Sequence, residues 1–137
     1  MKKKLRQVGG LLAALLAAST AVGQTKPGDT IADIPFAFTV SNHTLAPGRY
    51  TVTRLSEKAL RIFNSQNQGT FALTNRVEGK APESDKVIFH RYGNAYFLSE
   101  VWVAASRTGR KVLQSRSEKE LAGKRTKMEI AELQIAP

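Results

Sequence analysis

Cysteine is absent from this chain, and histidine, methionine and tryptophan are scarce, with two His, two Met and one Trp among 137 residues. Without cysteine the protein can form neither a disulfide nor a thiolate nucleophile. His43 and His90 are far apart and have no closely spaced ligand partner, so we expect no transition-metal site, which would need several N or S ligands. Glycine motifs that cradle phosphate are also missing, and the sequence therefore predicts no cofactor.

No apolar run reaches the ~20 residues that a membrane-spanning helix needs. The run at residues 8–22 follows a cationic start and ends in small residues, Ala21-Val22-Gly23, as a signal peptide does. We predict a signal peptide over residues 1–23, with cleavage after Ala21 or a retained anchor as alternatives. The protein is then exported, to the periplasm or beyond the cell.

After the signal peptide we expect a flexible leader over residues 24–33 and one β-rich domain over residues 34–137. The mature chain is long enough for one domain and too short for two. It carries a charge of +6, because four of the 21 Lys and Arg residues lie in the signal peptide and all 11 acids follow it. Excess positive charge favours anionic partners, although scattered charges of this kind also serve solubility alone.

The aromatic-rich stretch Lys86–Ala104 predicts the central hairpin, because Gly93-Asn94 between two apolar runs is typical of a two-residue turn with positive φ at glycine. Counting outward from the turn pairs Tyr92 with Ala95, Arg91 with Tyr96, His90 with Phe97, Phe89 with Leu98 and Val87 with Glu100. One face is then expected to hold Val87, Phe89, Arg91, Tyr96, Leu98, Glu100 and Trp102, and the other Ile88, His90, Tyr92, Phe97, Ser99, Val101 and Val103. Both faces carry large apolar groups, so we expect both to be covered. His90 and Glu100 would lie on opposite faces, and the hairpin would build no His–carboxylate pair.

Short alternating runs separated by turn residues predict the remaining strands. The runs lie at residues 34–40, 50–55, 60–64, 70–75 and 128–135, with loops that include residues 106–110. Leu45–Tyr50 (LAPGRY) is similar to the corner of β-sandwiches in which a Tyr hydroxyl bonds back to nearby backbone. Ser115 or Ser117, each with Glu three residues on, predicts a capped helix ending near Gly123. The fold class is therefore all-β, a small sandwich or partly closed barrel of six to eight strands with one short C-terminal helix.

One cluster could make external contacts. It comprises His90, Arg91, Tyr92, Tyr96 and Trp102. Arg91 opposite Tyr96 favours a cation–π contact, and basic surfaces with aromatic residues bind carbohydrates or single-stranded nucleic acid. The alternative interpretation is a core hairpin with Arg and His at its rim.

No catalytic constellation is visible, since the sequence has no G-x-S-x-G elbow and no evident pair of acids. The leading hypothesis is a non-enzymatic module that contacts an envelope protein or an anionic polymer. Binding of a polyanion or carbohydrate through basic and aromatic residues is one alternative, and a secreted hydrolase using His90 or His43 is another. Nucleic acid is not an expected partner of an exported protein.

Three segments together resemble a family of small exported bacterial proteins with no assigned function. They are residues 34–52 (IPFAFTVSNHTLAPGRYTV), 86–102 (KVIFHRYGNAYFLSEVW) and 115–121 (SRSEKEL). The resemblance covers most of the mature chain and implies a signal peptide and a compact β-rich domain. It implies no catalytic or binding residue.

Overall fold

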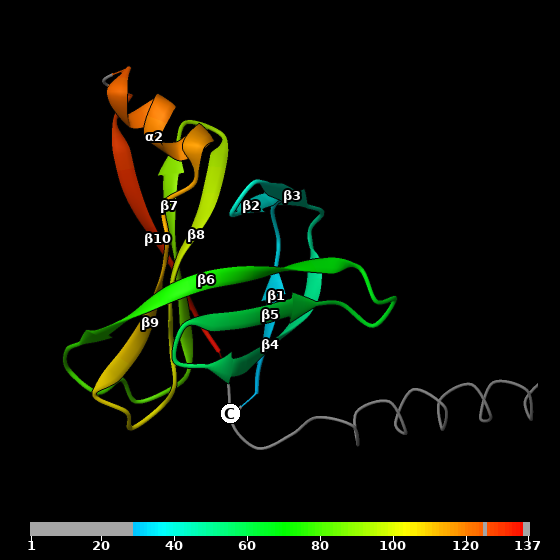
Figure 1. Cartoon of the computed structure of the whole chain (residues 1–137), viewed down its shortest axis with the longest axis vertical. Coiled ribbons are helices and arrows are strands. Elements are labelled where there is room, and N and C mark those ends of the chain that lie inside the picture. The colour runs from blue at the N-terminus through cyan, green and yellow to red at the C-terminus, as the bar shows by residue number, and fades with distance from the viewer. Residues whose placement is uncertain (1–28, 125, 136–137) are drawn as a thin grey trace, which may run out of the picture.

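The computed structural model describes residues 29–124 and 126–135, which form ten strands and one short helix (Figure 1). The strands are β1 (Thr30–Ile34), β2 (Phe38–Val40), β3 (His43–Leu45), β4 (Gly48–Ser56), β5 (Ala59–Phe63), β6 (Gly69–Glu78), β7 (Lys86–Tyr92), β8 (Ala95–Trp102), β9 (Thr108–Val112) and β10 (Met128–Gln134), and the helix is α2 (Arg116–Gly123). This confirms the all-β class with a C-terminal helix.

A single long strand, β6, joins two groups of strands. Its first half pairs with β5 and its second half with β9. The path of neighbours is β1-β4-β5-β6-β9-β8-β2-β3, and β7 pairs with both β8 and β10. In Figure 1, β4, β5 and β6 run across the view while β7, β8 and β10 run along it. The sheet is therefore folded over on itself at β6 without closing into a barrel.

The core lies on the inner side of this folded sheet, where alternate residues of most strands meet. Phe38 and Phe89 are among the largest fully buried side chains, and their rings meet edge to face at 5.6 Å between centroids. The other buried members include Ala32, Ile34, Val40, Tyr50, Val52, Leu60, Ile62, Ala72, Val87, Leu98, Val101 and Val112. The Tyr50 hydroxyl donates to the carbonyl of Ala46 at 2.7 Å, so the predicted tyrosine corner is confirmed.

Three predicted boundaries are wrong. Residues 30–33 are not leader: β1 pairs with β4 and buries Thr30 and Ala32, whose small side chains gave little hydrophobic signal. The remaining leader residues before Asp29 lie outside the described part. The single strand predicted over residues 34–40 is divided after Ile34, where Pro35 cannot donate to a ladder. Residues 108–110 belong to β9, and the short strands β2, β3 and β9 raise the total above the predicted six to eight.

Candidate functional site

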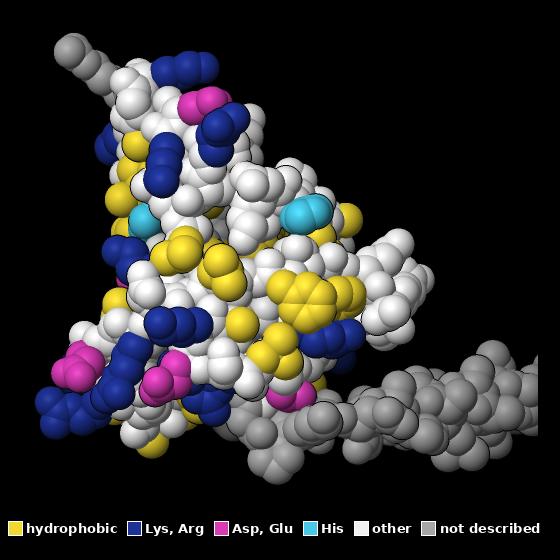
Figure 2. All heavy atoms as spheres, in the orientation of Figure 1, with side chains coloured by type: hydrophobic (Ala, Val, Ile, Leu, Met, Phe, Trp, Pro, Cys, Tyr) yellow, Lys and Arg dark blue, Asp and Glu magenta, His cyan; other side chains and the backbone are white. Residues whose placement is uncertain are grey.

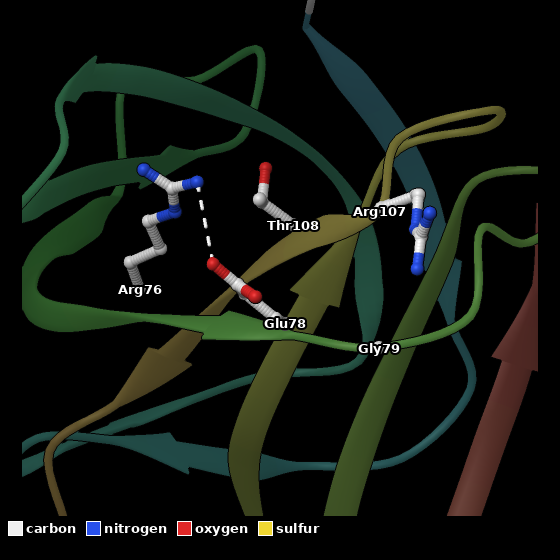
Figure 3. A pocket seen from close by; sticks show the side chains of 5 residues that line it. All are labelled: Arg76, Glu78, Gly79, Arg107 and Thr108. Carbon is white, nitrogen blue, oxygen red and sulfur yellow. Dashed lines mark ion pairs between the residues drawn. The ribbon is translucent and has the colours of Figure 1, made fainter.

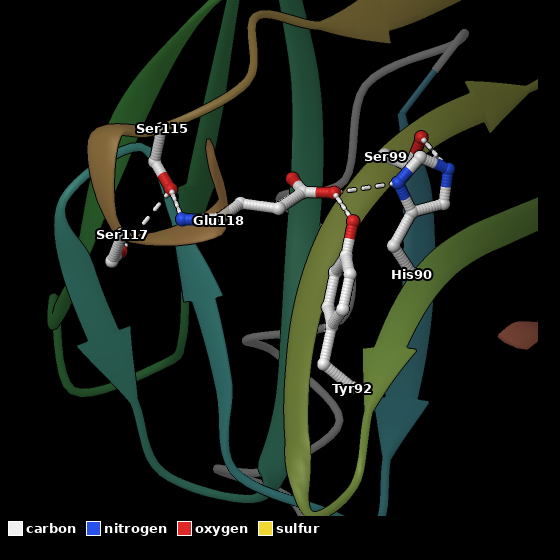
Figure 4. Close-up of polar contacts among 6 residues, drawn as sticks. All are labelled: His90, Tyr92, Ser99, Ser115, Ser117 and Glu118. Atoms are coloured by element: carbon white, nitrogen blue, oxygen red, sulfur yellow. Dashed lines mark hydrogen bonds and ion pairs between the residues drawn. The ribbon is translucent and has the colours of Figure 1, made fainter. Parts of the chain in front are cut away.

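Helix α2 lies on the outer side of the hairpin β7–β8, opposite the core. Its N-cap is Ser115, one of the two predicted candidates, and the Ser115 hydroxyl accepts from the backbone N–H of Glu118 at 3.1 Å. In a capping box the Glu side chain would return to the cap. Here the Glu118 side chain points away from the helix and toward β7 (Figure 4), and only 4% of Glu118 is exposed. The carboxylate therefore joins the helix to the sheet.

Glu118 is the centre of a polar network that includes His90, Tyr92 and Ser99 (Figure 4). Its Oε2 accepts from the Tyr92 hydroxyl at 2.9 Å and lies 2.7 Å from His90 Nδ1. A carboxylate only accepts, so Nδ1 carries a proton and donates to it. The other ring nitrogen, Nε2, lies 3.1 Å from the Ser99 hydroxyl. In a neutral imidazole Nε2 accepts from Ser99, and the connected order is Ser99, His90, Glu118.

Tyr92 is a permanent donor in this network. Burial of its hydroxyl raises the pKa of Tyr92 to about 12, and the hydrogen bond to Glu118 and the negative charge of Glu118 act in the same direction. A hydrogen bond from Gln114 opposes the pKa shift without cancelling it. Tyr92 therefore stays protonated at neutral pH and holds the Glu118 carboxylate in place.

A β-bulge brings Ser99 into the network. The register agrees with the prediction from Tyr92–Ala95 to Phe89–Leu98, and Gly93 has φ of +64° as the turn requires. Ser99 is then an extra residue, because Ile88 pairs with Glu100 and Val87 with Val101. The predicted pairing of Val87 with Glu100 is therefore wrong.

The bulge also exchanges the predicted faces beyond Ser99. Val101 joins the core, while Glu100 moves to the outer side that carries His90. Trp102 accompanies it, since its indole Nε1 donates to Glu100 at 2.8 Å. His90 nevertheless has a carboxylate partner, Glu118, which belongs to the helix and not to the hairpin.

A hollow of about 300 Å³ lies beside this network. Six segments of the chain meet there, and the lining residues are Asn75, His90, Ser99, Lys111, Val112, Leu113, Gln114 and Glu118. Ser99 itself is only 3% exposed and His90 retains 21% of its side-chain exposure. The hollow therefore borders the network at Ser99 and His90, and His90 is the more exposed of the two.

The hollow continues into an apolar surface on the outer side of β5 and β6, which no element of residues 29–124 or 126–135 covers. Figure 2 shows hydrophobic side chains gathered over these strands. We define this open face by Arg61 and Phe63 of β5, Phe71 and Leu73 of β6, and Leu113, which follows β9. Phe71 and Leu73 pair across to Arg61 and Ala59, and the backbone N–H of Leu113 donates to the carbonyl of Leu73. Leu113 thus belongs both to the open face and to the lining of the hollow.

A second hollow, of about 450 Å³, lies at the far end of β6 and β9 and is lined by Arg76, Glu78, Gly79, Arg107 and Thr108 (Figure 3). The side chains of Arg76 and Glu78 point toward each other and form an ion pair at 3.5 Å, while Arg107 points away from them. Both members of the pair are more than half exposed. The place is basic but has no hydrogen-bonded group of catalytic residues among the described side chains.

The five residues predicted as one contact cluster lie in three places. His90 and Tyr92 belong to the network under α2. Arg91 and Tyr96 lie on the other face, where the guanidinium is 5.6 Å from the Tyr96 ring centre, and the predicted cation–π contact is confirmed. Tyr96 also stacks on Phe36 at 3.7 Å. Trp102 is buried at the other end of β8. Its ring packs so closely on Gly109 that any side chain at that position would clash with it.

Sequence reasoning did not identify Glu118 or Ser99 as members of a site. Two signals were present in the sequence: Ser99 shares a predicted face with His90, and Glu118 is the acid of the capping box.

No family model, curated protein or solved structure matches this chain. Within the described ranges, no three His, Asp or Glu residues are grouped so as to hold a metal ion. None of the described residues form a helix with the length and apolar content needed to cross a bilayer.

Proposed function

We propose that the protein is an exported module that binds a partner protein of the cell envelope through the open face. The observation that carries this proposal is the exposure of its large apolar side chains: 56% for Phe71, 63% for Leu73 and 44% for Leu113. Soluble proteins rarely leave such groups together in water, and contiguous apolar patches mark interaction sites. The signal-peptide pattern of residues 1–23 supports export.

The charge of the open face favours an acidic, apolar segment of the partner. Arg61 lies over the Phe63 ring at 4.0 Å and donates to Asn67 at 3.3 Å, and none of the described carboxylates pairs with it. A guanidinium held on an aromatic ring keeps its remaining donors available to a carboxylate. Lys111 extends the positive charge toward the hollow, and the mature chain is basic as a whole.

Site-specific photo-crosslinking in the native cells tests this proposal. Benzoylphenylalanine would replace Phe71 or Leu73, and Lys119 on the exposed side of α2 would serve as the control position. We expect the same acidic protein to be captured from both open-face positions and not from Lys119. Binding of that purified partner should weaken about 10-fold with Arg61→Glu, equivalent to about 1.4 kcal/mol, and should weaken with added salt.

Three results would reject the proposal. One is capture that does not depend on position, another is the absence of any protein adduct, and the third is adducts with polysaccharide alone. The last result would favour the polymer-binding alternative.

A further inference from the structure

Ser99, His90 and Glu118 are connected in the order that activates a serine nucleophile. The Ser99 hydroxyl is 3.1 Å from His90 Nε2, and His90 Nδ1 is 2.7 Å from Glu118 Oε2. In serine hydrolases the imidazole takes the hydroxyl proton, while a buried Asp or Glu on its other nitrogen fixes the tautomer and stabilises the imidazolium. The same arrangement recurs on unrelated folds and is recognised by geometry and not by sequence order.

The surroundings of these three residues fit a small acyl substrate. The hollow of about 300 Å³ is near the lower limit of small-ligand pockets. Val112 and Leu113 provide apolar lining for a short acyl chain. Asn75 and Lys111 provide N–H donors on the same lining, and a cation near a developing oxyanion stabilises the transition state of acyl transfer.

Anchoring of the helix does not by itself require this arrangement. The Tyr92 hydroxyl already gives the buried Glu118 carboxylate a neutral donor at 2.9 Å. His90 adds a second donor and, through Nε2, extends the network to a hydroxyl at the edge of a hollow. The bulge that places Ser99 there is a feature enriched next to active sites.

We propose that Ser99 is the nucleophile of a site that hydrolyses short-chain carboxylic esters, with His90 as general base and acid and Glu118 as the positioning residue. This activity goes beyond the binding role proposed above. Ser99 Oγ attacks the ester carbonyl while its proton passes to His90 Nε2. The bond from the carbonyl carbon to the alcohol oxygen breaks, and the proton leaves with the alcohol. Water then attacks the acyl-Ser99 ester, releasing the carboxylic acid and restoring the Ser99 hydroxyl.

Covalent labelling of the purified protein with diisopropyl fluorophosphate tests the nucleophile directly. We expect the intact mass to increase by one diisopropylphosphoryl group, and peptide mapping to place that group on Ser99. Ser99→Ala should remain unlabelled, whereas the matched control Ser65→Ala, in an exposed turn, should label like the wild type. Hydrolysis of p-nitrophenyl acetate should be saturable, and His90→Gln should lower kcat by about 10²-fold or more.

Glu118→Gln separates positioning from anchoring, because the amide keeps the shape of the side chain. We expect kcat to fall by about 10²-fold or more with KM unchanged, in a protein whose circular dichroism is that of the wild type. No adduct, an adduct that maps away from Ser99, or ester turnover that survives in Ser99→Ala overturns the proposal. If Ser99→Ala does not fold, peptide mapping on the wild type decides the matter. The labelling and turnover experiments involve no partner protein, so their outcome leaves the binding proposal unaffected.

Discussion

The outer side of the sheet has two regions with opposite character. Over β7 and β8 it carries His90, Tyr92 and Ser99 and is covered by α2, whereas over β5 and β6 it carries Phe71 and Leu73 and is uncovered. Hydropathy alone would favour the reverse arrangement. Among the described residues, the helix covers the region where it completes hydrogen bonds, and no element covers the apolar region.

The covered region depends on hydrogen bonds to Glu118. A carboxylate that is only 4% exposed is costly unless donors replace its lost water, and Glu118 has two side-chain donors. The open face has no such requirement, since exposed apolar groups cost the fold little in the absence of a partner. The two regions should therefore respond very differently to substitution.

Glu118→Ala should have the largest effect on stability. The change leaves the buried Tyr92 hydroxyl and the His90 ring without their acceptor, and removes the tie between α2 and the sheet. We expect the free energy of unfolding to fall by about 3 kcal/mol, measured by urea denaturation. Glu120→Ala on the exposed side of the same helix is the matched control and should change stability little. Equal effects of the two changes would contradict the assigned role of Glu118.

Tyr92→Phe should have an intermediate effect that depends on pH. Near pH 8 the lost hydrogen bond to Glu118 should cost about 1 kcal/mol. Because the folded protein raises the pKa of Tyr92 from 10.0 to about 12, the wild-type advantage is fully present below pH 10 and is lost as pH rises toward 12. Urea denaturation of both proteins across this pH range gives the difference between their free energies of unfolding. Groups that titrate alike in both proteins cancel in that difference. A constant difference would show that the tyrosine is not held as described.

Leu73→Thr on the open face should have the smallest effect. Leu73 is 63% exposed and Thr suits a strand, so we expect the free energy of unfolding to change by no more than about 0.5 kcal/mol. The contrasting variant is Phe97→Ala on the covered region. Phe97 is only 5% exposed, and loss of its ring should lower the free energy of unfolding by about 3 kcal/mol. A large loss for Leu73→Thr would mean that the open face serves folding and not a partner.

The hairpin shows how far sequence reasoning reaches. Gly93-Asn94 and the flanking apolar runs identified the turn, the four pairs nearest to it and the face shared by His90 and Ser99. The bulge at Ser99 could not be predicted, because one extra residue leaves the local hydrophobic pattern almost unchanged while it exchanges every face beyond it. The positions of Glu100, Val101 and Trp102 were wrong for that one reason.

The candidate site was less predictable than the fold. Two Ser–Glu pairs marked the helix start, and the structure uses the first of them, with Ser115 as the cap. The Glu118 side chain could have closed the capping box. It instead bonds to His90, which is 28 residues away in sequence. The suspected family and the export of the protein stay predictions.

Periodicity, turn residues and caps are local properties, and they determined that this chain forms short strands, a central hairpin and one C-terminal helix. Contacts between distant segments determine which faces are buried from solvent and which polar groups form hydrogen bonds. A buried carboxylate finds its donors only after the helix has docked on the sheet. For that physical reason the Ser99–His90–Glu118 arrangement and the uncovered face of β5 and β6 were decided by the tertiary structure alone.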